Sequence, residues 1–298
     1  MLVDKRQIEG KDVYIFESHS TALVPWGQIR SKRSNAPNLI TLDYHTDTHE
    51  AFLLHYGKQF KGEYFSSGDD AFEKLRELLL SKIDVLNDAS LCEAANKLRN
   101  DEHIDAAIGA DIIDFAYVIS YDGQCTQSRE EIKYYEENYG GVNFIRTRFE
   151  GPQTPLPTRP YTYDVPESKI FVVDDSEGFE YNKNSKVDQE KQHYDFAIES
   201  PYLDRKLLII DEMGLSAGVK NVLAQDYILD IDLDYFKTRK SIEPRDKKTF
   251  YHLIKSAQAV TIAMEPYFVN EEKYPGEEID PEFLLAALLE HIHSSLVT

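Results

Sequence analysis

The chain contains the segment Leu42-Asp43-Tyr44-His45-Thr46-Asp47-Thr48-His49, which follows the apolar run Leu39-Ile40-Thr41 and so begins where a strand is expected to end. Asp43, His45 and Asp47 alternate with other residues, and a strand's period of two would point all three side chains to one side. Two carboxylates and an imidazole gathered in this way repel one another or stay unsatisfied unless a cation binds them. Alone, the segment fits either a metal site or a polar turn.

A second acidic stretch lies far along the chain, in Tyr227-Ile228-Leu229-Asp230-Ile231-Asp232-Leu233-Asp234. Its apolar residues predict a buried strand, and Asp230, Asp232 and Asp234 would share one face of it. Neighbouring carboxylates raise one another's pKa, and buried anions need partners, so a divalent cation would remove a large energetic penalty. A solvated acidic edge strand is the alternative, but the flanking residues are too apolar for it.

A third apolar run, Val13-Tyr14-Ile15-Phe16, is followed by Glu17-Ser18-His19-Ser20. By itself, His19 would be interpreted as an ordinary loop histidine. Together with the other two stretches it completes a set of six candidate metal ligands: His19, Asp43, His45, Asp47, Asp232 and Asp234. The carboxylate oxygens of such a set suit a hard divalent ion.

Three motifs carry a resemblance to a known family: Ser18-His19-Ser20, Asp43-Tyr44-His45-Thr46-Asp47 and Asp232-Leu233-Asp234. Their order and strand-end setting are similar to those of the arginase (ureohydrolase) superfamily. The chain most resembles the peptide arginases, which convert arginine side chains of ribosomal peptides to ornithine. Two departures concern the substrate side: Phe16-Glu17-Ser18-His19 replaces the usual Gly-Gly-Asp-His, and Tyr235-Phe236 replaces the glycine and Asp-Pro after the last motif.

The resemblance implies an α/β, three-layer arginase-like fold with a mainly parallel sheet and helices on both faces. Strand-like runs that alternate with helical stretches predict the same arrangement, and no repeat or composition break divides residues 1–298, so a single catalytic domain is expected. The resemblance also implies two Mn²⁺ ions. One would be bound by His19, Asp43, Asp47 and Asp232, and the other by Asp43, His45, Asp232 and Asp234. A hydroxide between them would attack the guanidinium carbon, releasing urea and leaving ornithine.

Four further residues are candidates for substrate binding and proton transfer. Glu265, followed at once by a proline, resembles the arginase glutamate that holds the guanidinium, with shorter spacing. His103 and His49 are rival candidates for passing protons to the leaving amine. His103 lies where arginases carry such a histidine, but a solvent-facing histidine is an equal alternative; His49 could instead contact substrate. Asp230 has no counterpart in the family, and it is expected either behind the ligands or facing the substrate.

The remaining elements are predicted from periodicity and turn residues. They include strands at Phe115–Ser120, Ile170–Val173 and Leu207–Ile210, a helix capped by Asp69 or Asp70, and a terminal helix from Pro281 to about His293. Residues 124–168 are polar, aromatic and proline-rich, and too long for an ordinary connection. This predicts a loop-rich excursion near the carboxyl ends of the strands, where it could shape a peptide groove. A surface insertion without that role is the alternative.

Composition limits the function classes. No apolar run approaches the length of a membrane span, the first residues have no apolar targeting core, and only two cysteines occur, so a cytoplasmic enzyme in a reducing compartment is expected. The net charge of −20 argues against a nucleic-acid partner and fits a cationic substrate, although it also fits plain solubility. The expected partner is an arginine-containing precursor peptide; the sequence does not indicate the oligomeric state.

Three other functions remain open. One is a ureohydrolase acting on free arginine or agmatine. Another is a metal-dependent, deacetylase-like amidohydrolase, which a carboxylate at Glu265 disfavours because it suits a cation better than a neutral acyl chain. The third is a catalytically silent metal-binding interaction protein, against which the complete set of six candidate ligands speaks.

Overall fold

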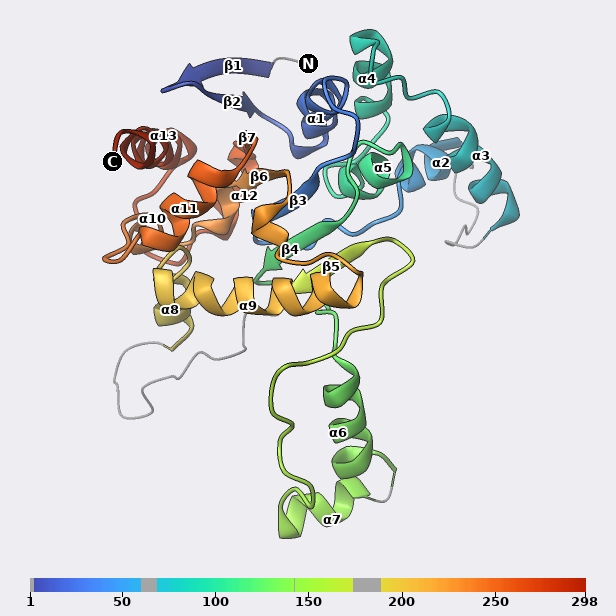
Figure 1. Cartoon of the computed structure of the whole chain (residues 1–298), viewed down its shortest axis with the longest axis vertical. Coiled ribbons are helices and arrows are strands. Elements are labelled where there is room, and N and C mark those ends of the chain that lie inside the picture. Colours follow the sequence, from blue (N-terminus) through green and yellow to red (C-terminus); the bar gives the residue numbers. More distant parts are fainter. Residues whose placement is uncertain (1–2, 60–68, 142, 174–188) are drawn as a thin grey trace.

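A seven-stranded sheet forms the centre of the molecule (Figure 1). The computed structural model describes residues 3–59, 69–141, 143–173 and 189–298. The strand order is β1-β2-β7-β6-β3-β4-β5, with β1 antiparallel to β2 and the other neighbours parallel. The strands are β1 (Val3–Ile8), β2 (Lys11–Phe16), β3 (Asn38–Asp43), β4 (Ala116–Ser120), β5 (Ile170–Val173), β6 (Tyr227–Asp232) and β7 (Ala259–Ala263). The predicted α/β fold with a mainly parallel sheet is confirmed.

Helices cover both faces of this sheet, which gives three layers. Alternate strand residues enter two separate apolar cores: Ile40 and Leu42 belong to one core and Leu39 to the other. The first core is completed by α9 (Ser200–Ser216), α11 (Lys248–Ser256) and α13 (Pro281–Val297). The second is completed by α1 (Leu23–Arg30), α4 (Asp88–Ala95) and α5 (His103–Gly109). Burial on both faces explains why the parallel strands read as near-continuous apolar runs.

The other elements are short or peripheral. The remaining α-helices are α2 (Leu53–Gln59), α3 (Asp70–Leu80), α6 (Arg129–Tyr139), α7 (Asn143–Glu150), α8 (Gln189–Tyr194), α10 (Arg239–Ile242) and α12 (Pro266–Glu272). Three 3₁₀ turns are η1 (His19–Ala22), η2 (Val222–Ala224) and η3 (Leu233–Tyr235). The predicted cap of α3 is Asp69, whose side chain accepts a hydrogen bond from the Ala71 N–H. No helix among the described residues is both long enough and apolar enough to cross a bilayer.

One sequence-based expectation is wrong. The run Leu207–Ile210 is not a strand but lies inside α9. Four apolar residues cannot distinguish a strand from a buried helix segment, and the burial of Leu203, Leu207, Ile210 and Met213 follows helical spacing. The segment predicted as a loop-rich excursion, residues 124–168, contains the two helices α6 and α7.

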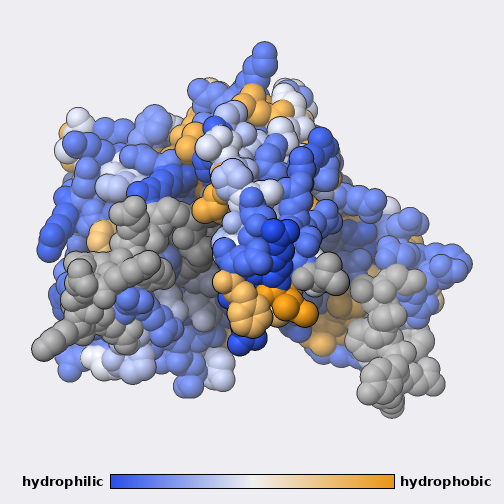
Figure 2. All heavy atoms as spheres, turned by 90° about the horizontal axis from the view of Figure 1, so that it is seen from below, coloured by the Kyte–Doolittle hydropathy of each residue, from blue (hydrophilic) through white to orange (hydrophobic). Residues whose placement is uncertain are grey.

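The two helices of the excursion form an arm, residues 129–150, that projects away from the sheet (Figure 1). Figure 2 looks toward the end of this arm and shows hydrophobic residues gathered there. Among the exposed large hydrophobic side chains of the described residues, Phe144, Ile145 and Phe149 of α7 are 52%, 63% and 82% exposed. The arm therefore has an apolar surface but adds little to the two cores.

Candidate metal centre

Four adjacent strands deliver the predicted site residues to one edge of the sheet. His19 follows β2, Glu265 follows β7, Asp232 ends β6 and Asp43 ends β3. These strands are neighbours in the order β2-β7-β6-β3 and run parallel, so their carboxyl ends lie side by side. Ligands of open α/β sheets bind at this edge. The fold thus brings together motifs that are more than two hundred residues apart in the sequence.

The first cluster surrounds Nδ1 of His19. This atom lies 3.4 Å from Asp43 Oδ2, 3.2 Å from Asp47 Oδ2 and 3.1 Å from Asp232 Oδ2. All four side chains are buried. These four residues are the ones that the resemblance assigns to the first ion.

The second cluster surrounds His45. Its Nδ1 lies 3.2 Å from Asp234 Oδ2 and 4.0 Å from Asp43 Oδ1. Asp43 therefore belongs to both clusters. It is a member of two groups whose ligand atoms lie close together, His19/Asp43/Asp232 and Asp43/His45/Asp234. Buried histidine and aspartate groups in this arrangement can hold a metal ion.

Each of three carboxylates is anchored by one oxygen and presents the other to a cluster. Asp43 Oδ1 accepts from the His45 N–H at 2.8 Å, Asp232 Oδ1 from the Asp234 N–H at 3.1 Å, and Asp234 Oδ1 from the Tyr44 N–H at 3.3 Å. The second oxygens of Asp43 and Asp234 are buried and have no hydrogen-bond partner among the described residues, and the same holds for His19 Nδ1. Buried polar atoms of this kind are rare and need a partner.

The spacing of these atoms fits a bound cation. Ligands about 2.1 Å from an ion are about 3.0 Å apart at octahedral angles and about 3.4 Å apart at tetrahedral angles. The distances from His19 Nδ1 to its three carboxylate neighbours, 3.1 to 3.4 Å, fall in that range. Around His19, two groups of ligand atoms lie close enough together to hold a metal ion: His19, Asp43 and Asp232 form one, and His19, Asp47 and His103 form the other.

Protonation in the metal-free protein reflects the same crowding. Burial raises the pKa of Asp43 well above its ordinary value, with the charge of Asp47 adding to the effect. Burial likewise raises the pKa of Asp232, with a contribution from Asp234, and it raises the pKa of Asp47 to about 6, against the lowering influence of His19. For His45, burial lowers the pKa, but the hydrogen bond and charge of Asp234 outweigh it and raise the pKa to about 10. A cation would take the place of these protons.

Strand alternation explains only part of this convergence: Asp230 and Asp232 lie two residues apart in β6, and both contact the His19 ring. β3 ends at Asp43, and the following residues turn, with Asp47 at a left-handed φ of 49°. Asp234 lies in the 3₁₀ turn η3 rather than in β6. The side chains reach two clusters because the chain bends after each strand. A left-handed backbone at a non-glycine residue costs about 1 kcal/mol or more and is concentrated at functional sites.

Asp230 lies behind the first cluster and not on the substrate side. It is fully buried, and its Oδ2 is 2.7 Å from His19 Nε2. Thr41 and Thr261 donate hydrogen bonds to its two oxygens. A carboxylate at Nε2 fixes the imidazole so that Nδ1 faces the cluster, which is the usual arrangement around metal-binding histidines. Of the two alternatives for Asp230, this supports the one behind the ligands.

The two candidate proton-transfer histidines differ sharply. His103 is not solvent-facing: it is fully buried, its Nδ1 lies 2.8 Å from the Asn100 carbonyl, and its ring packs 4.1 Å from that of His19. Burial lowers its pKa well below the ordinary value, and the charge of His19 adds to this. His49 has a side chain 55% exposed, with Nδ1 3.3 Å from Asp101 Oδ2. His49 is therefore the better placed of the two to exchange protons with a bound molecule.

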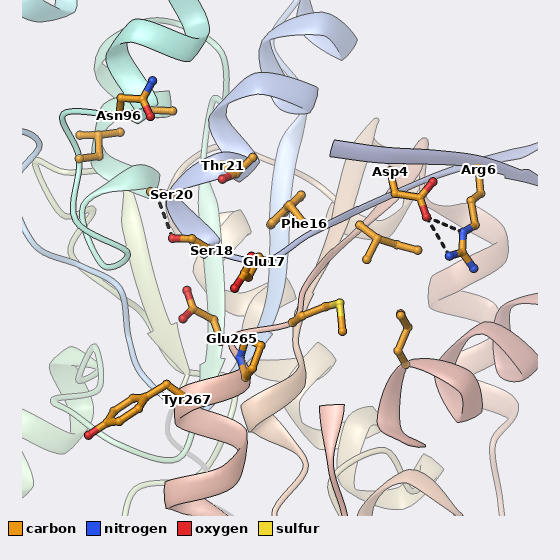
Figure 3. A pocket seen from close by; sticks show the side chains of 16 residues that line it. Asp4, Arg6, Phe16, Glu17, Ser18, Ser20, Thr21, Asn96, Glu265 and Tyr267 are labelled. Carbon is orange, nitrogen blue, oxygen red and sulfur yellow. Dashed lines mark hydrogen bonds and ion pairs between the residues drawn. The ribbon is translucent and has the colours of Figure 1, made fainter. Parts of the chain in front are cut away.

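Two hollows flank the candidate metal centre. A hollow of about 360 Å³ is lined by His45, Asp47, His49 and neighbouring residues, so it reaches candidate ligands directly. A larger hollow of about 1000 Å³ is lined by Glu265 and Glu17, among others (Figure 3). The larger hollow contacts none of the six candidate ligands itself, and it adjoins the first cluster through Glu265.

Glu265 connects the larger hollow to the first cluster. Its Oε1 accepts a hydrogen bond from the His19 N–H at 2.7 Å, and its backbone is left-handed, with φ of 35°. Figure 3 shows Glu265 and Glu17 close together on one side of this hollow, with the Asp4–Arg6 pair on the opposite side. Most of its other walls are apolar, including Phe16, Met264 and Leu285. The excursion helices contribute no residue to either hollow among the lining residues described.

Sequence reasoning missed three residues around His45. Glu272 Oε1 lies 3.4 Å from His45 Nε2, Lys237 pairs with Glu272, and the Phe268 ring lies edge-on to His45 at 5.5 Å. No motif points to them. Lys237 lies in the segment after β6, and Phe268 and Glu272 lie in α12. In the sequence, the two charged residues look like ordinary surface positions.

Comparison with known proteins adds no relative: no protein-family model matches this sequence, and no curated protein matches it significantly. The proposal below therefore depends on the resemblance of the three motifs and on the geometry of the residues.

Proposed function

We propose that this protein is a dinuclear metal hydrolase of the arginase type, which converts peptidyl arginine to ornithine and releases urea. The observation that carries the proposal is the pair of adjoining clusters, one around His19 and one around His45, which share Asp43. Two divalent ions, both Mn²⁺, would be bound. His19, Asp43, Asp47 and Asp232 would hold one ion, and Asp43, His45, Asp232 and Asp234 would hold the other. When bound, they would supply a water that ionises near neutral pH as the nucleophile.

The chain's own residues would bind the substrate and move the protons. Glu265 is a partly desolvated carboxylate beside the first cluster, which suits a guanidinium cation because charge-assisted hydrogen bonds are stronger than neutral ones. His49, in the smaller hollow, would pass a proton to the leaving amine. Asp230 would keep His19 oriented.

The size of the hollow at Glu265 favours a peptide over free arginine. Its volume is about 1000 Å³, far more than one arginine side chain fills, and its apolar walls suit the neighbouring residues of a peptide. The net charge of −20 suits a cationic substrate of either kind.

The direct test is urea release from the Mn²⁺-loaded protein with free arginine and with an arginine-containing peptide, combined with mass spectrometry of the peptide. Urea from the peptide, with arginine converted to ornithine, is the expected result. Urea from free arginine alone would favour the metabolic ureohydrolase. Bound metal without urea from either would favour the deacetylase-like or the silent alternative.

Glu265→Gln separates the arginine hydrolase from the deacetylase-like alternative. Glutamine keeps an oxygen that can accept from the His19 N–H but removes the charge that would pair with a guanidinium. We expect kcat/KM for the arginine peptide to fall about 10- to 100-fold while the Mn²⁺ content is unchanged. Glu17→Gln, an exposed carboxylate in the same hollow, is the matched control. An equal effect of both changes would contradict a specific role for Glu265.

A further inference from the structure

Helix α12 contacts both candidate metal clusters, one at each end. At its start, Glu265 accepts a hydrogen bond from the backbone of His19. At its last residue, Glu272 places Oε1 3.4 Å from Nε2 of His45. One short helix thus touches the histidine of each cluster. The second contact has no part in the ligand scheme described above.

Glu272 is in turn held by a buried lysine. Lys237 Nζ lies 3.0 Å from Glu272 Oε2 and 3.2 Å from the centre of the Tyr44 ring. The Lys237 side chain is only 2% exposed, whereas Glu272 is 26% exposed. A buried ammonium is expensive to desolvate, and replacing such a pair by apolar residues often stabilises a fold. Stability alone therefore gives little reason to place a lysine here.

The surroundings of His45 leave its ring few orientations. Its Nδ1 faces Asp234 Oδ2 at 3.2 Å, and the rings of Tyr44 and Phe268 lie edge-on to it, with centres 5.0 and 5.5 Å away. A carboxylate within ion-pair distance of Nε2 favours a proton on that nitrogen, which leaves Nδ1 free to bind an ion. Carboxylates that accept from the far nitrogen of a metal-binding histidine raise the basicity of the ligand and fix its direction.

We propose that Lys237 and Glu272 form a positioning pair that holds His45 with Nδ1 directed at Asp234 and thereby makes the second cluster a metal site. Asp230 does the same for His19 in the first cluster, so each histidine has its own carboxylate. The two carboxylates differ in support: threonines donate to Asp230, whereas a lysine anchors Glu272. This inference rests on the metal binding in the proposed function but not on the substrate.

The experiment measures Mn²⁺ binding by the purified full-length protein. Wild type is compared with Glu272→Gln, Lys237→Met and the control Glu271→Gln, which alters an exposed neighbour on the same helix. Elemental analysis after equilibration at a series of free Mn²⁺ concentrations gives the affinity of each site, and electron paramagnetic resonance distinguishes a coupled Mn²⁺ pair from single ions. Thermal unfolding of the metal-free proteins reports any purely structural effect.

We expect Glu272→Gln and Lys237→Met to weaken one of two sites about 10- to 100-fold, so that at limiting Mn²⁺ the coupled signal is replaced by that of a single ion. Glu271→Gln should behave as wild type. If Lys237→Met fails to fold, the partly exposed Glu272 still gives a decisive variant. If Glu272→Gln still binds Mn²⁺ at two sites with unchanged affinity, the positioning role of the Lys237–Glu272 pair is overturned, but the proposed function is not. Absence of Mn²⁺ binding in wild type would overturn both this inference and the proposed function.

Discussion

Asp43 is the residue on which both clusters depend. Its Oδ2 faces His19, while its Oδ1 accepts from the His45 backbone and lies near the His45 ring. A carboxylate buried in this way, next to Asp47 and Asp234, is unfavourable as an anion, as its raised pKa reflects. His19 offsets part of this cost in the metal-free protein, and a bound cation would offset more of it. The sequence predicted the ligand role of Asp43, but the two-sided contact depends on the turn that follows it.

His49 and His103 are distinguished by their surroundings rather than by sequence. We expect His49→Asn to lower kcat about 10²- to 10⁴-fold, the range for loss of a general acid or base, with little change in Mn²⁺ content. His103→Asn should instead lower the unfolding temperature, because it removes the ring packed on His19 and Trp26, and it should change kcat of the metal-loaded enzyme far less. Steady-state kinetics and thermal unfolding of both variants provide the check; the reverse pattern would make His103 the proton-transfer residue.

At the scale of elements, β3 and β6 form the part of the site that sequence could predict. Both read as apolar runs ending in carboxylates, and parallel pairing of Thr41 with Asp230 brings those ends together. The loops after the strands could not be predicted in detail, because period-two alternation stops at Asp43. Glu272 and Lys237 gave no signal at all, since their roles depend on how α12 packs beside η3.

The candidate ligands in the Asp43–His49 loop and in β6 also make metal binding depend on pH, because they titrate. Burial raises the pKa of Asp47 to about 6, so below that pH a proton competes with the ion, because ligands must be deprotonated. In the metal-free protein, the effect of Asp47 on the pH dependence of stability has the opposite sign to that of most aspartates. Between about pH 4 and 6 the native state binds this proton more tightly than the unfolded chain, so this group's contribution to stability falls as pH rises.

We therefore expect the gain in unfolding temperature on adding Mn²⁺ to be larger at pH 7 than at pH 5. The measurement is thermal unfolding with and without Mn²⁺ across that range. Asp47→Asn, which cannot titrate at this position, should reduce the dependence without abolishing it, because Asp43, Asp232 and His45 also give up protons to the ion, whereas Asp122→Asn, exposed in the same hollow, should leave it intact. A gain independent of pH in wild type would contradict the assignment of Asp47 as a ligand.

At the scale of the whole molecule, the candidate metal centre and the arm are separate features. The centre lies where β2, β7, β6 and β3 end, whereas α6 and α7 project from the connection between β4 and β5 (Figure 1). The sequence predicted an excursion here but left open whether it shapes the substrate groove. The lining of the two hollows comes from other segments of the described chain, so the geometry favours a surface element that is not required for the chemistry.

Shortening the arm tests this separation. The neck is closed by the antiparallel bridge between Ser128 and Tyr163 and by the hydrogen bond from the Arg129 N–H to the Thr162 carbonyl at 2.8 Å. Replacing residues 130–157 by a glycine-serine linker of about six residues, long enough to span roughly 13 Å, retains Arg159, which pairs with the buried Glu212. We expect full Mn²⁺ content and unchanged kcat/KM on a short arginine peptide, because neither core nor hollow loses a residue. A large fall in kcat/KM with metal retained would instead place the arm in substrate binding.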